Sequence, residues 1–305
     1  MCASHDRNFL SGLAQGNPNQ LVVQRLAVRT DRDSVEYASL TVDSRAFDDV
    51  RGKSRIRYTP ILESLFASVA VLVENEKDAL FFESAVDYYL QSNTSGGRKS
   101  LRDSLLFIPT NGNSNFASTA ELLHNLRSPT VIVGDLDLVS EPERLKKTVS
   151  AMDTGRSEQA FRLAQKIVAH FREIYSNELD GVPKNQREGK LKKKVAKHVS
   201  INHGDEQVRM LVDDLLEALK PAGVLLIPKG ELEDFDRDII DSKDKNEWAR
   251  AAIDQELYKE DAVQEFCSTI VEASLNAIKA EALNTGLKGT TDGTVTKETP
   301  SGSEV

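Results

Sequence analysis

The sequence has little cysteine, with only Cys2 and Cys267 among its 305 residues. So few thiols exclude a disulfide scaffold and a zinc site built on cysteines. No apolar run approaches the ~20 residues of a membrane-spanning helix. The N-terminal MCASHDRNFL also lacks the charged lead and hydrophobic stretch of a secretory signal. We therefore expect a soluble, cytoplasmic protein that makes no membrane contact.

Positive charge is also in deficit. Lysine and arginine number 39 against 48 acidic residues, which gives a formal net charge of −9. This balance excludes a protein that binds nucleic acid through bulk charge alone. Hydrophobic residues make up 39% of the chain and charged residues 29%, so the chain can bury a core. Its length corresponds to two domains of about 150 residues each.

Two segments near the N-terminus, 21–28 and 35–42, alternate apolar and polar residues, and a polar turn at 30–34 separates them. This pattern predicts two strands joined by a turn. Two strands cannot enclose a core by themselves. We therefore expect residues 1–57 to pack on the following domain or on a partner.

The following domain, expected at 58–283, alternates short apolar runs with segments of helical spacing. Apolar runs separated by helices indicate an α/β fold, an open parallel sheet of about four strands with helices on both faces. The expected strands are 69–73, 105–108, 130–133 and 224–227, and the expected helices are 76–90, 116–126, 208–219 and two within 248–280.

Two segments depart from this alternation. A helical insertion is expected at about 157–205, between the third and fourth strands, and a very polar stretch at 183–198 interrupts its helical pattern. From 284 to 305 the chain is Gly, Thr, Ser and charge with almost nothing apolar, so we expect a disordered tail.

Acidic residues follow three of the four expected strands, at the ends where open parallel sheets gather their functional groups. They are Glu74 and Asp78 after the first strand, Asp135 and Asp137 after the third, and Glu231 and Glu233, beside Lys229, after the fourth. Each motif alone has a structural explanation, because acids complement the dipole of a helix first turn and D-x-D is common in turns. Their coincidence at one edge favours a shared site.

So many carboxylates in one cleft would repel one another. Mg²⁺ or Mn²⁺ resolves this conflict, since both ions suit hard oxygen ligands. Two such ions about 3.5–4 Å apart activate a water and stabilise the leaving oxygen of a phosphodiester. Gly134 and Gly230 suit such a site, because a missing Cβ lets a phosphate approach closely.

The order of these motifs resembles a TOPRIM domain, the metal-binding module shared by topoisomerases, primases and certain nucleases. VENEKDALFF at 73–82 is similar to the first motif of the OLD (overcoming lysogenisation defect) family of ATPase–nucleases. IPKGELEDF at 227–235 is similar to a third motif that is more specific to that family. The segment 116–137 and the helical insertion also fit, and the similarity covers about 58–280.

The resemblance implies roles for individual residues. The implied metal ligands are Glu74, Asp78, Asp135, Asp137, Glu231 and Glu233. Glu74, Asp135 and Asp137 are also the implied catalytic residues, and Lys229 either stabilises charge on the phosphate or pairs with neighbouring acids. Asn75 departs from the glycine usual in the family. Because asparagine tolerates a left-handed backbone well, we expect this change to matter little.

The segment 4–10 resembles the switch-histidine segment that ends an ABC-type ATPase domain, which implies that His5 senses a γ-phosphate. Yet GGRKS at 96–100 lacks the first glycine of a G-x-x-x-x-G-K-[ST] loop. We therefore expect no ATP hydrolysis by this chain alone. Residues 1–57 would be the C-terminal remnant of an ATPase domain, and ATP would act only through an ATPase module that is absent or is a separate subunit.

One basic segment, 184–198, stands out in the acidic chain, and its candidate phosphate contacts are Lys190, Lys192, Lys193 and Lys194. Such contacts give affinity without sequence choice. A solvated helix or loop is the alternative explanation. No aromatic residues interleave the lysines, so stacking on single-stranded bases is not supported and double-stranded DNA is the expected partner.

These observations predict a Mg²⁺- or Mn²⁺-dependent DNA endonuclease or nickase that is coupled to an ATPase module. By resemblance, the setting is phage defence or DNA processing, and a homodimer is the expected assembly. The first alternative is a non-catalytic TOPRIM subunit that binds metal and nucleic acid within an ATPase assembly. The second is a primase-like polymerase, against which the segment 230–233 argues.

Overall fold

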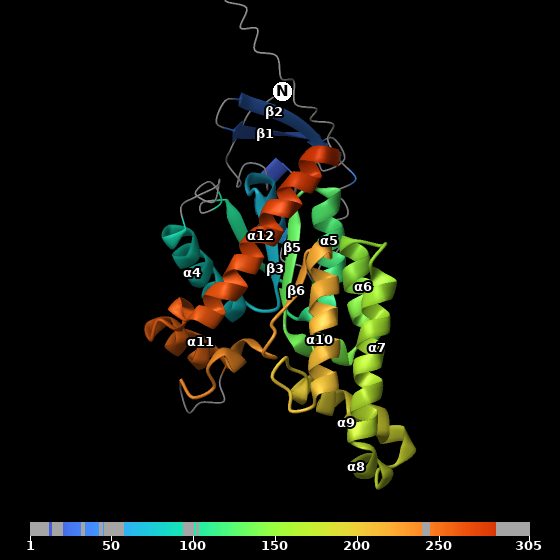
Figure 1. The fold of residues 1–305 in the computed structure, drawn as a ribbon. Coiled ribbons are helices and arrows are strands. Elements are labelled where there is room, and N and C mark those ends of the chain that lie inside the picture. Colours follow the sequence, from blue (N-terminus) through green and yellow to red (C-terminus); the bar gives the residue numbers. More distant parts are fainter. Residues whose placement is uncertain are drawn as a thin grey trace, which may run out of the picture.

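The computed structural model describes residues 12–13, 21–31, 34–42, 45, 58–93, 101, 104–239 and 245–284 (Figure 1). His5 and the tail expected at 284–305, except residue 284 itself, lie outside these residues. None of the helices in the described ranges is both long and apolar enough to cross a membrane.

The centre of the fold is a sheet of four parallel strands in the order β4-β3-β5-β6, which confirms the predicted α/β class. The strands are β3 (Val69–Val73), β4 (Leu105–Pro109), β5 (Thr130–Gly134) and β6 (Val224–Leu226). Every residue of β3 and β5 is buried. The short apolar runs therefore became strands that are covered on both faces.

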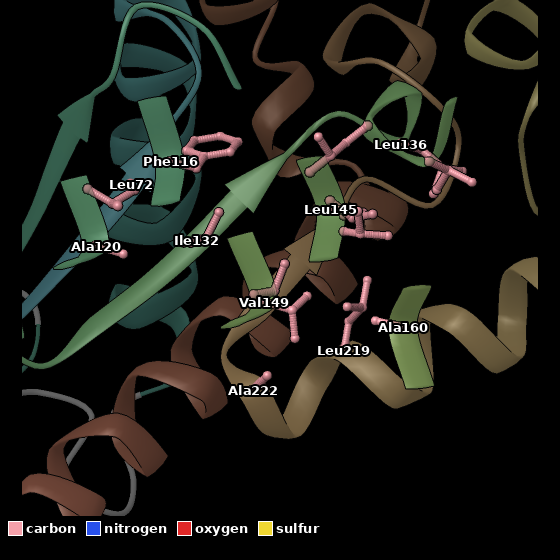
Figure 2. Packing of buried hydrophobic residues seen from close by; sticks show 14 of the residues in the cluster. Leu72, Phe116, Ala120, Ile132, Leu136, Leu145, Val149, Ala160, Leu219 and Ala222 are labelled. Atoms are coloured by element: carbon pink, nitrogen blue, oxygen red, sulfur yellow. The ribbon is translucent and has the colours of Figure 1, made fainter. Parts of the chain in front are cut away.

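Helices cover both faces of this sheet because successive strand residues point to opposite sides. Leu72 and Ile132 pack with Phe116 and Leu145 on one face (Figure 2). The helices on that face are α5 (Phe116–Asn125), α6 (Pro142–Met152) and α10 (Glu206–Leu219). Those on the opposite face are α4 (Glu76–Ser92), α11 (Lys245–Asp254) and α12 (Asp261–Asn284) (Figure 1).

The connection from β5 to β6 is a helical arm, which includes α6 and α10. Its remaining helices are α7 (Ser157–Ile174), α8 (Ser176–Asp180) and α9 (Lys184–His198). The polar stretch 183–198, which the sequence indicated as an interruption, is the helix α9. Its Lys, Arg, Gln and Glu residues have good helix propensity, and Leu191 and Val195 are its buried anchors.

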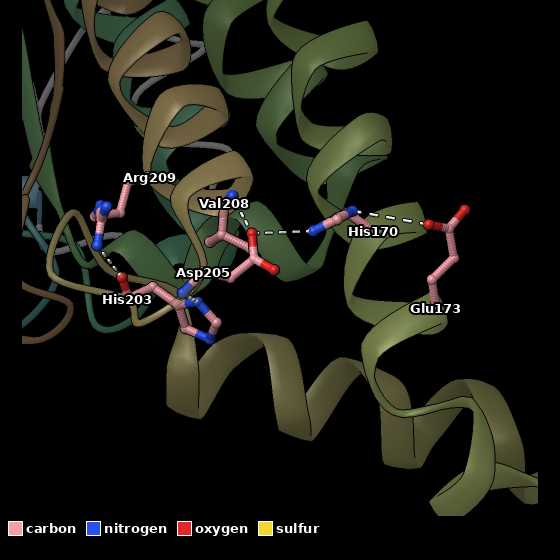
Figure 3. A network of polar contacts seen from close by, with 6 residues as sticks. All are labelled: His170, Glu173, His203, Asp205, Val208 and Arg209. Carbon is pink, nitrogen blue, oxygen red and sulfur yellow. Dashed lines mark hydrogen bonds and ion pairs between the residues drawn. The ribbon is translucent and has the colours of Figure 1, made fainter.

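A polar network joins α7 to the start of α10 (Figure 3). Asp205 is the N-cap of α10, and its Oδ1 accepts a hydrogen bond of 3.1 Å from the Val208 N–H. His170 Nε2 of α7 lies 3.2 Å from the same oxygen. The Val208 N–H is the main reason that the pKa of Asp205 is lowered, with His170 contributing. These contacts hold the two long helices of the arm in register.

The N-terminal strands β1 (Val23–Asp31) and β2 (Ser34–Val42) form the predicted antiparallel hairpin. Val42 is buried in the same hydrophobic cluster as Ile61 of α3 (Tyr58–Glu63), which confirms that the hairpin packs on the following domain. Short 3₁₀ segments complete the described chain: η2 (Ser64–Phe66), η4 (Asn113–Asn115), η5 (Leu136–Ser140), η6 (Lys220–Ala222), η7 (Leu232–Phe235) and η8 (Leu257–Lys259).

Candidate metal centre at the carboxyl edge of the sheet

The strand order reverses between β3 and β5. The chain moves from β3 to β4 on one side and then crosses to β5 on the other. In open α/β sheets, ligands bind in the crevice beyond such a switch point. Leu72 pairs with Ile132 in the register of these strands. Glu74 and Asp135 therefore emerge from neighbouring strands, which lie about 4.8 Å apart in any sheet.

Backbone hydrogen bonds tie the loop after β6 to the loop after β5. The Leu136 N–H donates to the Gly230 carbonyl oxygen over 2.8 Å, and the Ile227 N–H donates to that of Gly134 over 2.9 Å. The second and third acidic motifs, some 95 residues apart in the chain, are therefore neighbours at one edge, as predicted from the strand ends.

Two glycines allow this close approach. A Cβ at Gly134 would lie 3.0 Å from Cε2 of Phe116, so the ring packs directly on the backbone. Gly230 has φ +130°, and a Cβ there would lie 2.3 Å from Oδ2 of Asp234. Gly230 suits glycine for both space and conformation, whereas a side chain at position 134 would force the Phe116 ring to move.

The carboxylates of Glu74, Asp135 and Asp137 are half-buried at this edge. The backbone of Glu74 is held by the Gly112 N–H, which donates to its carbonyl oxygen over 2.9 Å. Glu74 Oε2 and Asp137 Oδ1 are buried oxygens that accept no hydrogen bond within the described residues, although both side chains have other interactions.

Asp78 lies in the first turn of α4 and is 6% exposed. Its Oδ2 accepts a hydrogen bond of 2.8 Å from the Asn75 N–H, so it caps the helix that it belongs to. Asn75 has φ −136° and ψ 169°, an extended conformation. The left-handed backbone that we considered for Asn75 is therefore wrong, and asparagine is accommodated there as an ordinary N-cap residue.

Glu233 has a partner that the sequence analysis missed. Its Oε1 accepts a hydrogen bond of 2.7 Å from Nζ of Lys77, and the two side chains are 15% and 9% exposed. A lysine in the first turn of a helix opposes the helix dipole, and this unfavourable placement was the available signal that Lys77 needs an acidic partner. The ion pair joins the first motif to the third.

The acids of η7 form a second cap. The Glu231 N–H donates to Asp234 Oδ2 over 2.8 Å, and Asp234 also pairs with Arg237. Asp234 is a further residue that the sequence analysis did not select. Its cap holds the turn that presents Glu231, which is half-buried.

The donor chemistry of this edge fits a divalent cation. Carboxylate oxygens are the ligands that Mg²⁺ and Mn²⁺ prefer. Within the described ranges, however, no three His, Cys, Asp or Glu side chains are close enough together to hold an ion as they are oriented. Carboxylates without a cation repel one another, so rotation of side chains on a fixed backbone would be needed for binding. The ligand roles of the six carboxylates thus stay a prediction.

Lys229 precedes η7 in the chain. Its Nζ is 5.5 Å from the centroid of the Phe235 ring, and it lines a cavity of about 480 Å³ with Asp236, Glu260 and Asp261. The ammonium of Lys229 therefore faces the Phe235 ring, and the acidic residues of the same cavity lie around it. Neither of the two roles considered for Lys229 is tested by this arrangement.

The four candidate lysines of α9 fall into two classes. Lys192 pairs with Glu141 over 2.7 Å, and Lys194 pairs with Glu178 over 2.6 Å. The hydrogen bond that Lys194 donates to Glu178 raises the pKa of Lys194. Lys190 and Lys193 are exposed, and with Lys197 they occupy positions i, i+3 and i+7 of one helix face. The buried Leu191 and Val195 lie on the other side of α9, so this lysine face is directed toward solvent.

Comparison with known proteins supports the first two motifs. Residues 65–137 match the family model described as "Overcoming lysogenization defect protein-like, TOPRIM domain". The matched segment contains Glu74, Asp78, Asp135 and Asp137, and the third acidic motif lies beyond it. No curated protein and no solved structure matches the chain.

Proposed function

We infer that the protein is a Mg²⁺- or Mn²⁺-dependent endonuclease or nickase of DNA. The basis is the match of residues 65–137 to the OLD-like TOPRIM domain, a module with a metal-dependent, nucleic-acid-related function. The observation that carries this proposal is the emergence of Glu74 and Asp135 from neighbouring parallel strands at the switch point of the sheet. Acidic groups at this place are typical of ligand and catalytic sites in such sheets.

In the proposed mechanism, Glu74, Asp135 and Asp137 hold the divalent cation. When bound, the cation supplies Lewis acidity for hydrolysis of a phosphodiester. Glu231 would be a further ligand at the same edge, and the missing Cβ at Gly230 lets Asp234 pack against the turn that presents it. Lys229 would contribute positive charge to the phosphate after turning from Phe235.

DNA would lie along the exposed face of α9. Lys190, Lys193 and Lys197 contact phosphates in this proposal, whereas Lys192 and Lys194 hold the helix to Glu141 and Glu178. Replacing Lys190 and Lys193 with glutamate should weaken duplex binding and lower the slope of log affinity against log salt by about 1.8, as for two lost phosphate contacts.

The control for this experiment is a variant with the same charge change on α6 and α7, K147E/K166E, because both of these lysines are exposed. Fluorescence anisotropy with a short DNA duplex over a series of salt concentrations measures both quantities. An equal loss of affinity in the two double variants would show that only net charge matters, which contradicts a binding face on α9.

By the same resemblance, we propose that an ATPase module regulates the cleavage and that the protein acts in phage defence or DNA processing as a homodimer. His5 would belong to that module. Adding a separately expressed ATPase partner with ATP should change the cleavage rate, whereas ATP with this chain alone should not.

Nicking of supercoiled plasmid in Mg²⁺ or Mn²⁺ tests the enzymatic function. E74Q and D135N remove one charge each with little change of shape, and both should abolish nicking. E76Q is the matched control, because Glu76 is an exposed acid in the first turn of α4, just after Glu74 in the chain. Equal nicking by E74Q, D135N and the unmodified protein would assign the cleavage to another site or to a contaminant.

The second candidate function is a non-catalytic subunit that binds metal and nucleic acid. The observation that favours it is the exposed lysine face of α9, which suits phosphate contacts without any chemical step. Metal binding and duplex binding without any nicking would support this function over the nuclease.

A further inference from the structure

We propose that Arg144 of α6 binds a backbone phosphate of the nucleic acid and so positions the substrate beside the acidic motifs. The proposal rests on the nuclease function inferred above and adds to it a substrate-binding residue that none of the acidic motifs contains. Two features carry it: the open edge of the Arg144 guanidinium, and the groups that hold this side chain in place.

Arg144 lies at the carboxyl edge of the sheet. It is in the first turn of α6, which follows β5 and η5, and a helix that follows a parallel strand begins at that edge. Nη1 of Arg144 donates a hydrogen bond of 3.0 Å to Oδ1 of Asn113, after β4. The adjacent Gly112 N–H donates to the carbonyl oxygen of Glu74 over 2.9 Å. Two consecutive residues of one loop therefore contact Arg144 and Glu74.

The loop after β4 is held by hydrogen bonds of its own. Oγ1 of Thr110, a residue that is 4% exposed, donates to the carbonyl oxygen of Val73 over 3.0 Å. Nδ2 of Asn115 donates to the carbonyl oxygen of Thr110 over 2.8 Å. Asn113 is thus fixed relative to the end of β3, and it holds Arg144 there. A side chain that is already positioned loses little conformational entropy when it binds a ligand.

The guanidinium of Arg144 has donors to spare. Its contacts with Asn113 and Glu141 both use Nη1. Within the described ranges, Nε and Nη2 donate to no protein group, and the side chain is 35% exposed. These two nitrogens form one edge of the planar group, where two N–H bonds match two oxygens of a phosphate. The edge that the protein leaves open is therefore one that suits a bidentate phosphate contact.

The charges around Arg144 favour an anion. Oε1 of Glu141 accepts a hydrogen bond from Arg144 and also lies 2.7 Å from Nζ of Lys192, so that one carboxylate faces two cations. The next acid, Glu143, is exposed. Arg144 is also at the positive end of the α6 dipole, where a cation is disfavoured without a further negative partner. A phosphate of the substrate would be that partner.

Binding of a short DNA duplex in the presence of a chelator tests the proposal without any cleavage. R144Q should weaken binding about tenfold, as for one lost contact between charged groups, and lower the slope of log affinity against log salt by about 0.9. R144K keeps the charge without the paired donors, so it should keep the slope and lose part of the affinity. K192M removes a positive charge from the same Glu141 and is the matched control, which should keep both quantities.

An R144Q protein that binds the duplex as tightly as the unmodified protein would overturn the role of Arg144 and leave the nuclease assignment intact. An equal loss in R144Q and K192M would also overturn it, because the effect would then come from net charge or from the Glu141 cluster. Should R144Q fail to fold by circular dichroism, R144K decides, since the proposal requires that it bind more weakly than the unmodified protein.

The nuclease function and the role of Arg144 can fail separately. Weaker duplex binding by R144Q, in a protein that nicks no plasmid, would support the phosphate contact and remove the nuclease. An unmodified protein that binds no duplex would overturn both.

Discussion

Replacing Lys77 with methionine removes an ammonium and keeps much of the length of the side chain, so it isolates the charge of the Lys77–Glu233 pair. The variant leaves Glu233, only 15% exposed, without its compensating cation. Removing one partner of a buried pair costs about 3–5 kcal/mol of unfolding free energy. Relief of the unfavourable helix-dipole interaction returns about 0.3–1 kcal/mol.

The residual exposure of both side chains places this pair at the lower end of the range, so we expect a net loss of about 2–3 kcal/mol. Urea unfolding at pH 7 in the presence of a chelator measures this loss. K192M provides the comparison, because the side chains of Lys192 and Glu141 are 47% and 24% exposed. Such a pair contributes about 0.2–1 kcal/mol.

The double variant K77M/E233Q should recover most of the stability lost in K77M, because the unpaired carboxylate is then gone. A loss in K77M no larger than that in K192M would refute the reasoning. So would a double variant that is less stable than K77M, since that would show that packing of the two side chains, and not their charge, holds the motifs together.

Three further predictions concern other parts of the fold. Gly230→Ala should lower the unfolding free energy by about 1–3 kcal/mol, because φ is +130° there and the new Cβ would clash with Oδ2 of Asp234. Gly189→Ala in α9 should instead raise it by about 0.5–1 kcal/mol, because there is open space around this glycine, and a thermal shift of the same sign in both variants would contradict this reasoning. Burial raises the pKa of Cys267 to about 12, so with the other cysteine replaced by serine the native protein should not react with a thiol reagent at pH 8 until it unfolds. Burial also lowers the pKa of His124 below 6.5, so the unfolded chain binds the proton more readily and the unfolding free energy should fall as the pH drops below about 6.5. His124→Gln should reduce this dependence of the urea midpoint on pH between pH 7.5 and pH 5.5, and an unchanged dependence would argue against His124 as its source.

The strands and the acids at their ends could be read from the sequence because both are local signals. The run at 69–73 is apolar throughout, which is typical of a strand buried on both faces, and it is β3 residue for residue. The convergence of the second and third motifs then followed from parallel topology, and the bond between Leu136 and Gly230 confirms it.

Helix α9 shows where local reasoning failed. Its charged residues carry little apolar periodicity, so the pattern at 183–198 indicated an interruption although helix propensity was high. Two buried residues, Leu191 and Val195, were enough to anchor it on the arm. The packing of α9 on η5 and on α8 decided which lysines are held in pairs and which face outward.

The sequence by itself determined which residue types gather at the carboxyl edge, since the strands and the acids that follow them are local signals and the carboxyl ends of parallel strands share one edge. Only the tertiary structure decided how those charges are distributed. Lys77 and Glu233 meet over a separation of 156 residues, and Asp78 caps its own helix. Such pairings depend on distances between side chains from different loops, and electrostatic energy at a few ångströms is too sensitive to those distances to be read from spacing along a chain.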